Sequence, residues 1–315
     1  MNIRKANISD LDGICSLMKE ENDGNVSNEY LENWYWKNPF KSHSLIICEE
    51  NGKTLGISST NNFKMNIHGT EKLIAFPQKV LTSNEIRGKG FFSKLYFENE
   101  KDNIDNQKVD HFLTFTNEMS TPIFLDKFGY KRGISPSITI LPTLPRFQRA
   151  DPKRMREVNE LDDKYLSDKD LIQRPESIIK DRKYYDWRYG QELNGTDKSF
   201  IKLEIFNEDL ILGYAILKKV VRMKLPFFYL TEIITHSKDY IPDIIRSARC
   251  YSSSKGAFGL MLINNYMTDN SIDNYSFKLT IKNRLNFLVK GKSQIETEEL
   301  AITSFNFSFG DLDFI

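Results

Sequence analysis

The sequence has 315 residues, and 40% of them are hydrophobic, which provides a normal core for one large domain or for two domains of about 150 residues each. Its 44 basic and 43 acidic residues leave a net charge of +1, which argues against a partner such as nucleic acid or an anionic membrane that is recognised through a long-range field. The three cysteines suit a reducing compartment and lack metal-type spacing, and no signal peptide or transmembrane run is recognisable, so we expect a cytoplasmic protein without a metal site.

The first half predicts an alternation of strands and helices. A strand at 2–6 precedes a helix that Ser9-Asp10-Leu11-Asp12 opens, and a second helix at 27–37 is stopped by Asn38-Pro39. An Asn51-Gly52 turn joins strands at 45–48 and 55–59 as a hairpin. The remaining predicted elements are strands at 60–67 and 72–82, a helix at 88–102, a strand at 109–116, a short helix at 122–127 and a final strand at 137–141.

A proline-containing connector follows, and we place the domain boundary near residue 148, which gives domains at 1–148 and 149–315. The second half repeats the order of sequence features of the first half in a degenerate form. Tyr30 and Trp34 precede a hairpin with Leu55-Gly56-Ile57, and Tyr184 and Trp187 precede a hairpin with Leu212-Gly213-Tyr214. This ordered repeat favours a duplicated fold.

The segment around Gly88 and Gly90 predicts a phosphate-binding loop. A strand-like run meets these two glycines and then a helix. The glycines let the backbone turn and expose its amides, the helix N-terminus adds partial positive charge, and Arg87 and Lys89 add formal charge. We therefore expect a polyphosphate to bind here.

The corresponding entry in the second half has no glycine pair. Asp239 and Asp243 stand near the start of a helix expected at 241–254, where their carboxylates would occupy the place of phosphates. The chemistry is therefore assigned to the first domain.

These motifs resemble the GNAT family of acyl-CoA N-acyltransferases, in particular two-domain bacterial members. The family's helix entry, Gln/Arg-x-x-Gly-x-Gly/Ala, appears as Glu85-Ile86-Arg87-Gly88-Lys89-Gly90, and Asn117 follows the next strand. The resemblance covers residues 1–142 by motif and the remainder by element order. It implies an α/β fold of mixed sheets, with two tandem GNAT-like domains that are each a mostly antiparallel sheet flanked by helices.

The resemblance also implies a site for acetyl-CoA or another acyl-CoA as co-substrate. The residues that would hold its pyrophosphate and line its pantetheine arm are Leu81, Thr82, Arg87, Gly88, Lys89, Gly90, Phe91 and Phe92. The family's first Gln/Arg is replaced by Glu85, and the tyrosine that protonates the departing thiolate in many relatives is replaced by Phe124 or Leu125. Water, Ser120 or Tyr130 would then donate that proton.

Direct attack by a neutral amine on the thioester needs alignment, an oxyanion donor and a proton acceptor. Glu85 and Asn117 are our catalytic candidates, Asn117 being equally an N-cap. Further candidates for the base are Glu20, Glu21, Asp23 and His111, although most such acids are solvated surface residues and such a histidine is more often packed in the sheet. Trp34 is interpreted as a core residue rather than as part of an acceptor pocket.

The resulting hypothesis is an N-acyltransferase, most simply an N-acetyltransferase, that acts on a small-molecule amine such as an amino sugar of a surface-polysaccharide pathway. The second domain would shape the acceptor cleft or form a homodimer interface. The alternatives are a tRNA-dependent aminoacyl transferase of the peptidoglycan type, for which we would expect a stronger basic surface, and a non-catalytic acyl-CoA-binding protein, which the missing tyrosine suggests.

Overall fold

The computed structural model describes residues 1–21, 26–143, 155–166, 171–190, 200–265, 268, 271–272, 275, 277–282 and 285–312. The chain forms two compact units. Unit 1 contains Met1–Gly133 and Asn286–Thr303, and unit 2 contains most of the remaining described residues. Each unit holds a mixed sheet flanked by helices, so the expected fold class is confirmed. No helix in the described part of the chain is long and apolar enough to cross a membrane.

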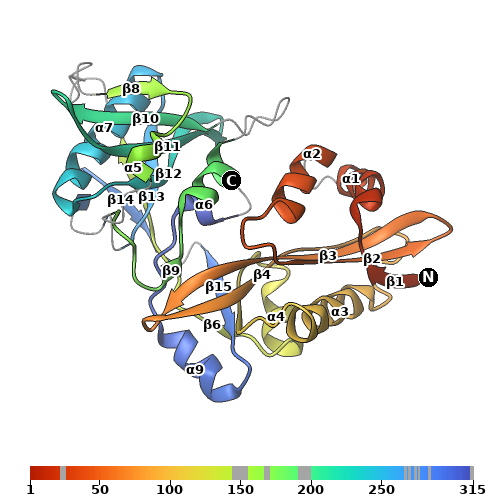
Figure 1. Ribbon diagram of the computed structural model, residues 1–315. Coiled ribbons are helices and arrows are strands. Elements are labelled where there is room, and N and C mark those ends of the chain that lie inside the picture. Colours follow the sequence, from red (N-terminus) through yellow and green to blue (C-terminus); the bar gives the residue numbers. More distant parts are fainter. Residues whose placement is uncertain are drawn as a thin grey trace. The chain divides into compact units, whose positions relative to one another are not determined.

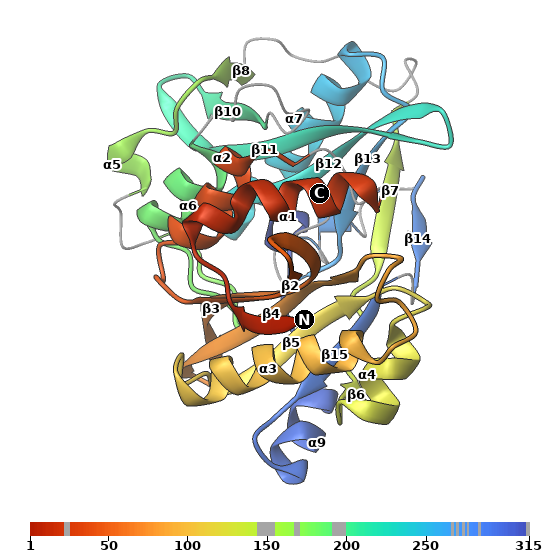
Figure 2. The ribbon, with the colours of Figure 1, turned by 90° about the vertical axis from the view of Figure 1, so that its right-hand side faces the viewer.

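Unit 1 is built on a sheet with the strand order β1-β2-β3-β4-β5-β15-β6. Its strands are β1 (Asn2–Lys5), β2 (His43–Glu50), β3 (Lys53–Ile67), β4 (Thr70–Thr82), β5 (His111–Thr116), β6 (Lys131–Arg132) and β15 (Asn286–Lys290). Its helices are α1 (Leu11–Glu20), α2 (Asn28–Leu31) with a π-helical continuation (Glu32–Trp36), α3 (Phe91–Asp105), α4 (Thr121–Lys127) and α9 (Gln294–Ile302), preceded by a 3₁₀ turn (Ile8–Asp10). Figures 1 and 2 show α1 and α2 on one face of this sheet, and α3 and α4 on the other.

The strand β3 is longer than the sequence predicted. The expected break between residues 59 and 60 is wrong, because β3 runs without interruption from Lys53 to Ile67. Its polar middle, residues 58–62, is buried, and Thr60 and Asn62 bond to asparagine side chains of α3. Asn99 of α3 donates from Nδ2 to the Ser58 carbonyl oxygen at 2.9 Å, and Thr60 donates to its Oδ1. These paired polar groups let a polar run continue as a buried strand.

Unit 2 repeats part of this succession of elements. Its strands are β7 (Ile138–Pro142), β8 (Met155–Val158), β9 (Ser177–Ile178), β10 (Ile201–Asn207), β11 (Leu210–Arg222), β12 (Leu225–Ile234), β13 (Gly259–Ile263) and β14 (Leu279–Ile281). Its helices are α5 (Asp163–Leu166), α6 (Arg182–Tyr189) and α7 (Ile241–Ser254), with 3₁₀ turns at Lys238–Tyr240 and Phe309–Asp311. One sheet takes the order β14-β7-β13-β12-β11-β10-β8.

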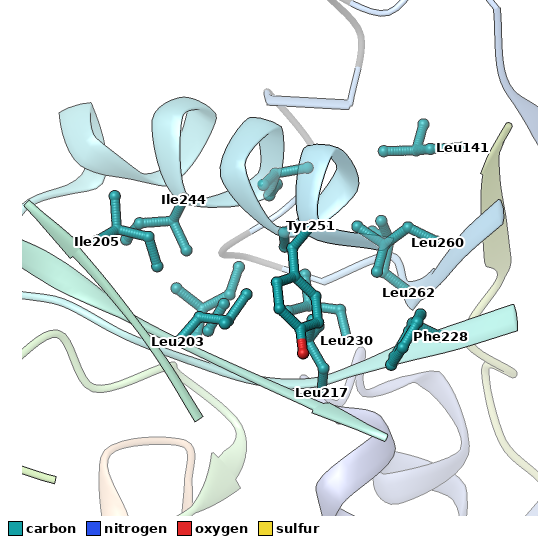
Figure 3. Packing of buried hydrophobic residues seen from close by; sticks show 14 of the residues in the cluster. Leu141, Leu203, Ile205, Leu217, Phe228, Leu230, Ile244, Tyr251, Leu260 and Leu262 are labelled. Carbon is teal, nitrogen blue, oxygen red and sulfur yellow. The ribbon is translucent and has the colours of Figure 1, made fainter. Parts of the chain in front are cut away.

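The core of unit 2 lies between α7 and its sheet. Figure 3 shows Ile244 and Tyr251 of α7 pointing toward Leu203, Leu217 and other apolar side chains of the strands. Helix α7 is amphipathic and buries seven of its residues, and its bounds match the helix expected at 241–254. Three antiparallel strands, a helix and a parallel strand follow one another here as β10-β11-β12-α7-β13, as β2-β3-β4-α3-β5 do in unit 1.

The strand that completes each sheet comes from a part of the chain that the sequence did not indicate. The boundary expected near residue 148 lies outside the described residues, but the strand expected to close the first domain is β7, which pairs with β13 and β14 of unit 2. In unit 1, the place beside β5 is taken by β15, whose Phe287, Leu288 and Val289 are at most 1% exposed. Both runs are short and apolar, so their composition does not say which sheet each one joins.

Candidate functional site

The site begins where two parallel strands of unit 1 separate. Strand β4 pairs with β5 only at Ile74 with His111 and at Ala75 with Phe112. Beyond Ala75, β4 continues to Thr82 with β3 as its recorded strand partner. Its backbone groups on the side away from β3 are therefore outside the β4–β5 ladder. This opening is called the fork of unit 1.

A β-bulge marks the start of the open part of β4. Thr60 pairs with Pro77 and Ser59 with Lys79, so Gln78 is the extra residue on β4. Pro77 has no amide hydrogen, which suits the interrupted ladder. The bulge is held from both neighbouring strands, because Thr114 Oγ1 donates to the Pro77 carbonyl oxygen at 2.7 Å and the Lys79 amide donates to Ser59 Oγ at 3.2 Å.

A cavity of about 880 Å³ occupies the fork. Its walls come from the open part of β4, the end of β5, the loop before α3, the first turn of α3 and the start of α4. The residues that line it are Glu21, Pro77, Gln78, Lys79, Val80, Leu81, Thr82, Ile86, Arg87, Gly88, Gly90, Phe92, Ser93, Thr114, Phe115, Thr116, Asn117, Met119, Ser120, Ile123, Phe124 and Lys127. The cavity has the size of a cofactor or substrate pocket.

The glycine loop has the geometry that the sequence predicts. Gly88 and Gly90 have φ angles of 77° and 81°, in the left-handed region that strongly favours glycine. Gly90 is the N-cap of α3, so the amides of the helix's first turn have no intrahelical acceptor. Because Gly90 and Phe92 line the cavity, the N-terminus of α3 faces it, and an anion bound there would meet free amides and the helix dipole.

Arg87 lines the cavity but is already tethered. Its guanidinium donates to Glu21, to Asn84 Oδ1 at 2.7 Å and to the Thr82 carbonyl oxygen at 3.0 Å. The Glu21 side chain is only 8% exposed, and it also accepts from the Asn84 amide. The ion pair with Glu21 thus links the end of α1 to the glycine loop, and half of the Arg87 side chain remains open to solvent.

Three predicted site residues do not line the cavity. Glu85 is exposed and forms a 2.7 Å ion pair with Lys53, so the catalytic role predicted for it has no geometric support. Lys89 is also exposed. The side chain of Phe91 packs against the buried cluster that contains Ile86 and Leu95, which leaves its amide as the group able to bind a ligand. By contrast, Leu81 and Thr82 both lie on the cavity wall.

Asn117 follows β5 directly, lies at the cavity wall, and stabilises the turn that leads into α4. Its Oδ1 accepts from the Ser120 amide at 2.8 Å and from Ser120 Oγ at 3.0 Å. This fixes the side-chain oxygen and leaves Nδ2 as a donor beside the cavity. Asn117 thus holds the turn before α4, but the N-cap of that helix is Ser120, so the N-cap prediction for Asn117 is wrong, and a ligand contact through Nδ2 stays a prediction.

Some of the other residues considered for proton transfer line the cavity, and others do not. Ser120 and Glu21 line the cavity, whereas Tyr130 and His111 do not. Tyr130 is buried against Tyr96, their hydroxyls 2.8 Å apart, and burial raises the pKa of both phenols. Burial also lowers the pKa of His111. Glu20 lies outside the cavity, and Asp23 lies outside the described residues.

The sequence analysis did not predict the bulge at Gln78 or the side chains that bond to it. Gln78 lines the cavity, and its Oε1 accepts from Trp34 Nε1 at 2.8 Å and from the Tyr35 hydroxyl at 3.3 Å. Trp34 and Tyr35 are each 3% exposed, so the core interpretation of Trp34 is confirmed. The signal that was present in the sequence is Pro77, since a proline inside a strand indicates an edge or a bulge.

The corresponding fork of unit 2 is filled by its own chain. Strand β12 leaves β13 after Tyr229, and the C-terminal segment 305–312 lies at this place. Phe309 stacks on Tyr229 with ring centroids 4.3 Å apart, and Asn265, which follows β13, donates to the Phe307 carbonyl oxygen at 2.7 Å. The segment contains the 3₁₀ turn at Phe309–Asp311.

A buried polar cluster stabilises the segment 305–312. Lys180 forms ion pairs with Glu232 and Asp311, and Arg174 pairs with Glu232 at 2.7 Å. Ser308 donates to Asp311 at 3.0 Å. Burial alone would raise the pKa of Asp311, but Lys180 and Arg174 hold it below its usual value. Asp243 lies in the first turn of α7, as expected.

Comparison with known proteins agrees with this geometry. Residues 2–133 match the model of the acetyltransferase (GNAT) domain. Similar solved structures include a probable N-acyltransferase from Enterococcus faecalis V583, with a TM-score of 0.65 and 15% identity over 92% of this chain and 72% of that one. A GCN5-related N-acetyltransferase from Anabaena variabilis gives a TM-score of 0.64 and 13% identity over 91% and 72% of the two chains.

The fold is also similar to that of N-myristoyltransferase from Saccharomyces cerevisiae, solved with bound myristoyl-CoA. The TM-score is 0.57, with 12% identity over 92% of this chain and 78% of the yeast chain. No curated protein matches the sequence. At these identities the likeness shows the fold, and the domain match places a GNAT acetyltransferase domain in unit 1.

Proposed function

We propose that this chain, whose residues 2–133 form a GNAT acetyltransferase domain, is an N-acyltransferase that uses acyl-CoA. The observation that carries the proposal is the open fork of unit 1, whose cavity is bordered at one end by the N-terminus of α3. Acetyl-CoA is the proposed donor, and a small-molecule amine in the cytoplasm, first of all an amino sugar, is the proposed acceptor. The acceptor class rests on resemblance to two-domain relatives.

Different parts of the cavity would bind different parts of acyl-CoA. The amides of Gly90, Phe91 and Phe92, the dipole of α3 and the exposed part of Arg87 would hold the pyrophosphate. The free edge of β4 near Leu81 and Thr82 would pair with the amides of the pantetheine arm, as an added strand pairs with a sheet edge. The thioester would then lie toward the bulge.

In the reaction, the acceptor nitrogen adds to the thioester carbon and the carbonyl electron pair moves to oxygen. When this intermediate collapses, the C–S bond breaks, and the proton lost by the amine balances the one gained by the thiolate. Among the described residues of the cavity wall, Glu21 is the carboxylate, but its bonds to Arg87 and to the Asn84 amide hold it beside the glycine loop, away from the bulge. We therefore propose water, instead of Glu85, as the proton acceptor. Ser120 is the proposed proton donor, since Phe124 occupies the region where relatives carry tyrosine.

The test is titration calorimetry with acetyl-CoA, followed by a thiol-release assay with a panel of amines. We expect binding at one site per chain, because the fork of unit 2 is occupied by residues 305–312. Binding together with amine-dependent thiol release supports the transferase. Binding without release would favour the non-catalytic acyl-CoA-binding protein, which the phenylalanine at 124 also suits. Failure to bind acetyl-CoA or CoA would refute the assignment.

A further inference from the structure

The side chain of Gln78 is held in one orientation at the cavity wall. It is the extra residue of the bulge, it lies half-buried on the cavity wall, and it meets two buried aromatic side chains. We propose that Nε2 of Gln78 donates a hydrogen bond to the thioester carbonyl oxygen of bound acyl-CoA. This inference rests on the proposed function of the cavity.

The orientation of the Gln78 amide follows from the chemistry of its partner. The indole Nε1–H of Trp34 can only donate, so the atom 2.8 Å from it must be the amide oxygen. The Tyr35 hydroxyl, 3.3 Å from the same oxygen, completes its coordination. The NH₂ group is therefore the free end of the side chain, and it is available to a ligand in the cavity.

The position of the Gln78 backbone is fixed as firmly as its side chain. The carbonyl of Pro77 accepts from Thr114, and the amide of Lys79 donates to Ser59, so both flanks of the bulge are anchored. Trp34 and Tyr35 are buried in the core of unit 1 and cannot turn freely. A donor held this way is preorganised, which makes it effective in stabilising charge that develops during a reaction.

The location of Gln78 suits the acyl end of the donor. Thr82 and the glycine loop stand at one end of the open part of β4, and Gln78 lies four residues earlier. Four residues of extended strand span about 13 Å, a distance that an extended pantetheine arm can bridge. An arm that starts at the α3 N-terminus and follows β4 brings its thioester to the bulge, where the oxygen becomes negative as the amine adds.

The inference is tested with two ligands that differ only at the carbonyl. Acetyl-CoA has the oxygen, and S-ethyl-CoA has a methylene in its place. Because one hydrogen bond contributes about 1 kcal/mol, the native chain should prefer acetyl-CoA by roughly fivefold in calorimetry. Gln78→Glu keeps an oxygen for Trp34 but removes the NH₂ donor, and Gln78→Met removes both without adding charge.

We expect both variants to lose most of this preference while they still bind S-ethyl-CoA. Gln294→Glu, which makes the same change at an exposed position on α9, is the matched control and should keep the preference. Trp34→Phe removes the donor that orients Gln78 and should reduce the preference by less than Gln78→Met does. An unchanged preference in both Gln78 variants would overturn the inference, because the amide would then serve the acceptor or the fold.

The same experiment separates this inference from the proposed function. If the native chain binds neither ligand, the acyl-CoA site itself is refuted, and with it the role of Gln78. If the native chain binds both ligands equally, the site stands and the hydrogen bond from Gln78 is refuted. Thermal unfolding of each variant identifies any loss of fold, and Gln78→Met serves if Gln78→Glu unfolds.

Discussion

The substitution Gly90→Ala tests the glycine loop with the smallest possible change. Gly90 has a φ angle of 81°, and an added Cβ would have no heavy atom within 4 Å in the protein. The cost to stability is therefore the backbone strain of a left-handed alanine, about 1 kcal/mol. For a unit of this size such a cost lowers Tm by about 2–4 °C.

The effect on ligand binding should be larger than the effect on stability. The open space around Gly90 is where the pyrophosphate is proposed to lie, so a methyl group there would displace an oxygen from the amides of the α3 N-terminus. Loss of one charge-assisted hydrogen bond is worth about 2 kcal/mol, which corresponds to roughly a 30-fold weaker affinity for acetyl-CoA.

Gly52→Ala is the matched control for this experiment. Gly52 lies in the turn between β2 and β3, has a φ angle of 78° and likewise has no atom within 4 Å of an added Cβ. Both variants should therefore unfold at nearly the same temperature, and only Gly90→Ala should bind acetyl-CoA more weakly in calorimetry. Equal affinities in the two variants would refute the reasoning that places the phosphates at the start of α3.

Three further outcomes are expected. Asn99→Ala should reduce the urea-measured free energy of unfolding by about 2–4 kcal/mol, because four polar partners on the strands and α3 lose a buried bond. Lys180→Met should reduce the free energy of unfolding by about 3–5 kcal/mol, because the buried carboxylates of Glu232 and Asp311 lose a cationic partner. The affinity for acetyl-CoA should not change. Burial lowers the pKa of His43 to about 4, and Lys5 adds to this shift while Asp102 opposes it. The neutral ring therefore stabilises the fold fully above pH 6.5, and this contribution of about 2 kcal/mol, after allowance for partial solvation, is lost as the pH falls through 4. NMR titration of His43 and urea unfolding at several pH values, compared with His43→Gln, check this.

The parts of the fold that depend on local chemistry were predictable. Glycines at positive φ before a helix, a turn at Asn51-Gly52 and an amphipathic helix at 241–254 each leave a signal within a few residues. The glycine loop was therefore located correctly, and its amides lie where the sequence predicted them. The roles of the individual residues in that loop remain predictions.

The parts that depend on pairing between distant segments were not predictable. Gln78 is a bulge residue only because Ser59 and Thr60 set the register of β3 against β4, and its orientation depends on Trp34, 44 positions away. The strand β15 joins β5 although Thr116 and Asn286 are 170 positions apart, and its short apolar run has the composition of any buried strand. Glu85 was favoured by its place in a motif, but the loop turns its side chain toward Lys53.

The two forks explain why a repeated fold need not repeat its chemistry. Both units separate a pair of parallel strands after a few residues and place an asparagine after the second strand, Asn117 in one and Asn265 in the other. In unit 1 the opening continues to the glycine loop, and Asn117 keeps a free donor beside the cavity. In unit 2 the donor of Asn265 is used by the carbonyl of Phe307, and Tyr229 is covered by Phe309.

The segment that closes the second fork contributes main-chain and aromatic contacts of the kind a bound ligand would make, and its anchoring at Asp311 makes it part of the fold. Where two paired strands of a sheet separate, backbone groups lose their partners. Residues 305–312 cover this place in unit 2, whereas in unit 1 it remains open as the cavity.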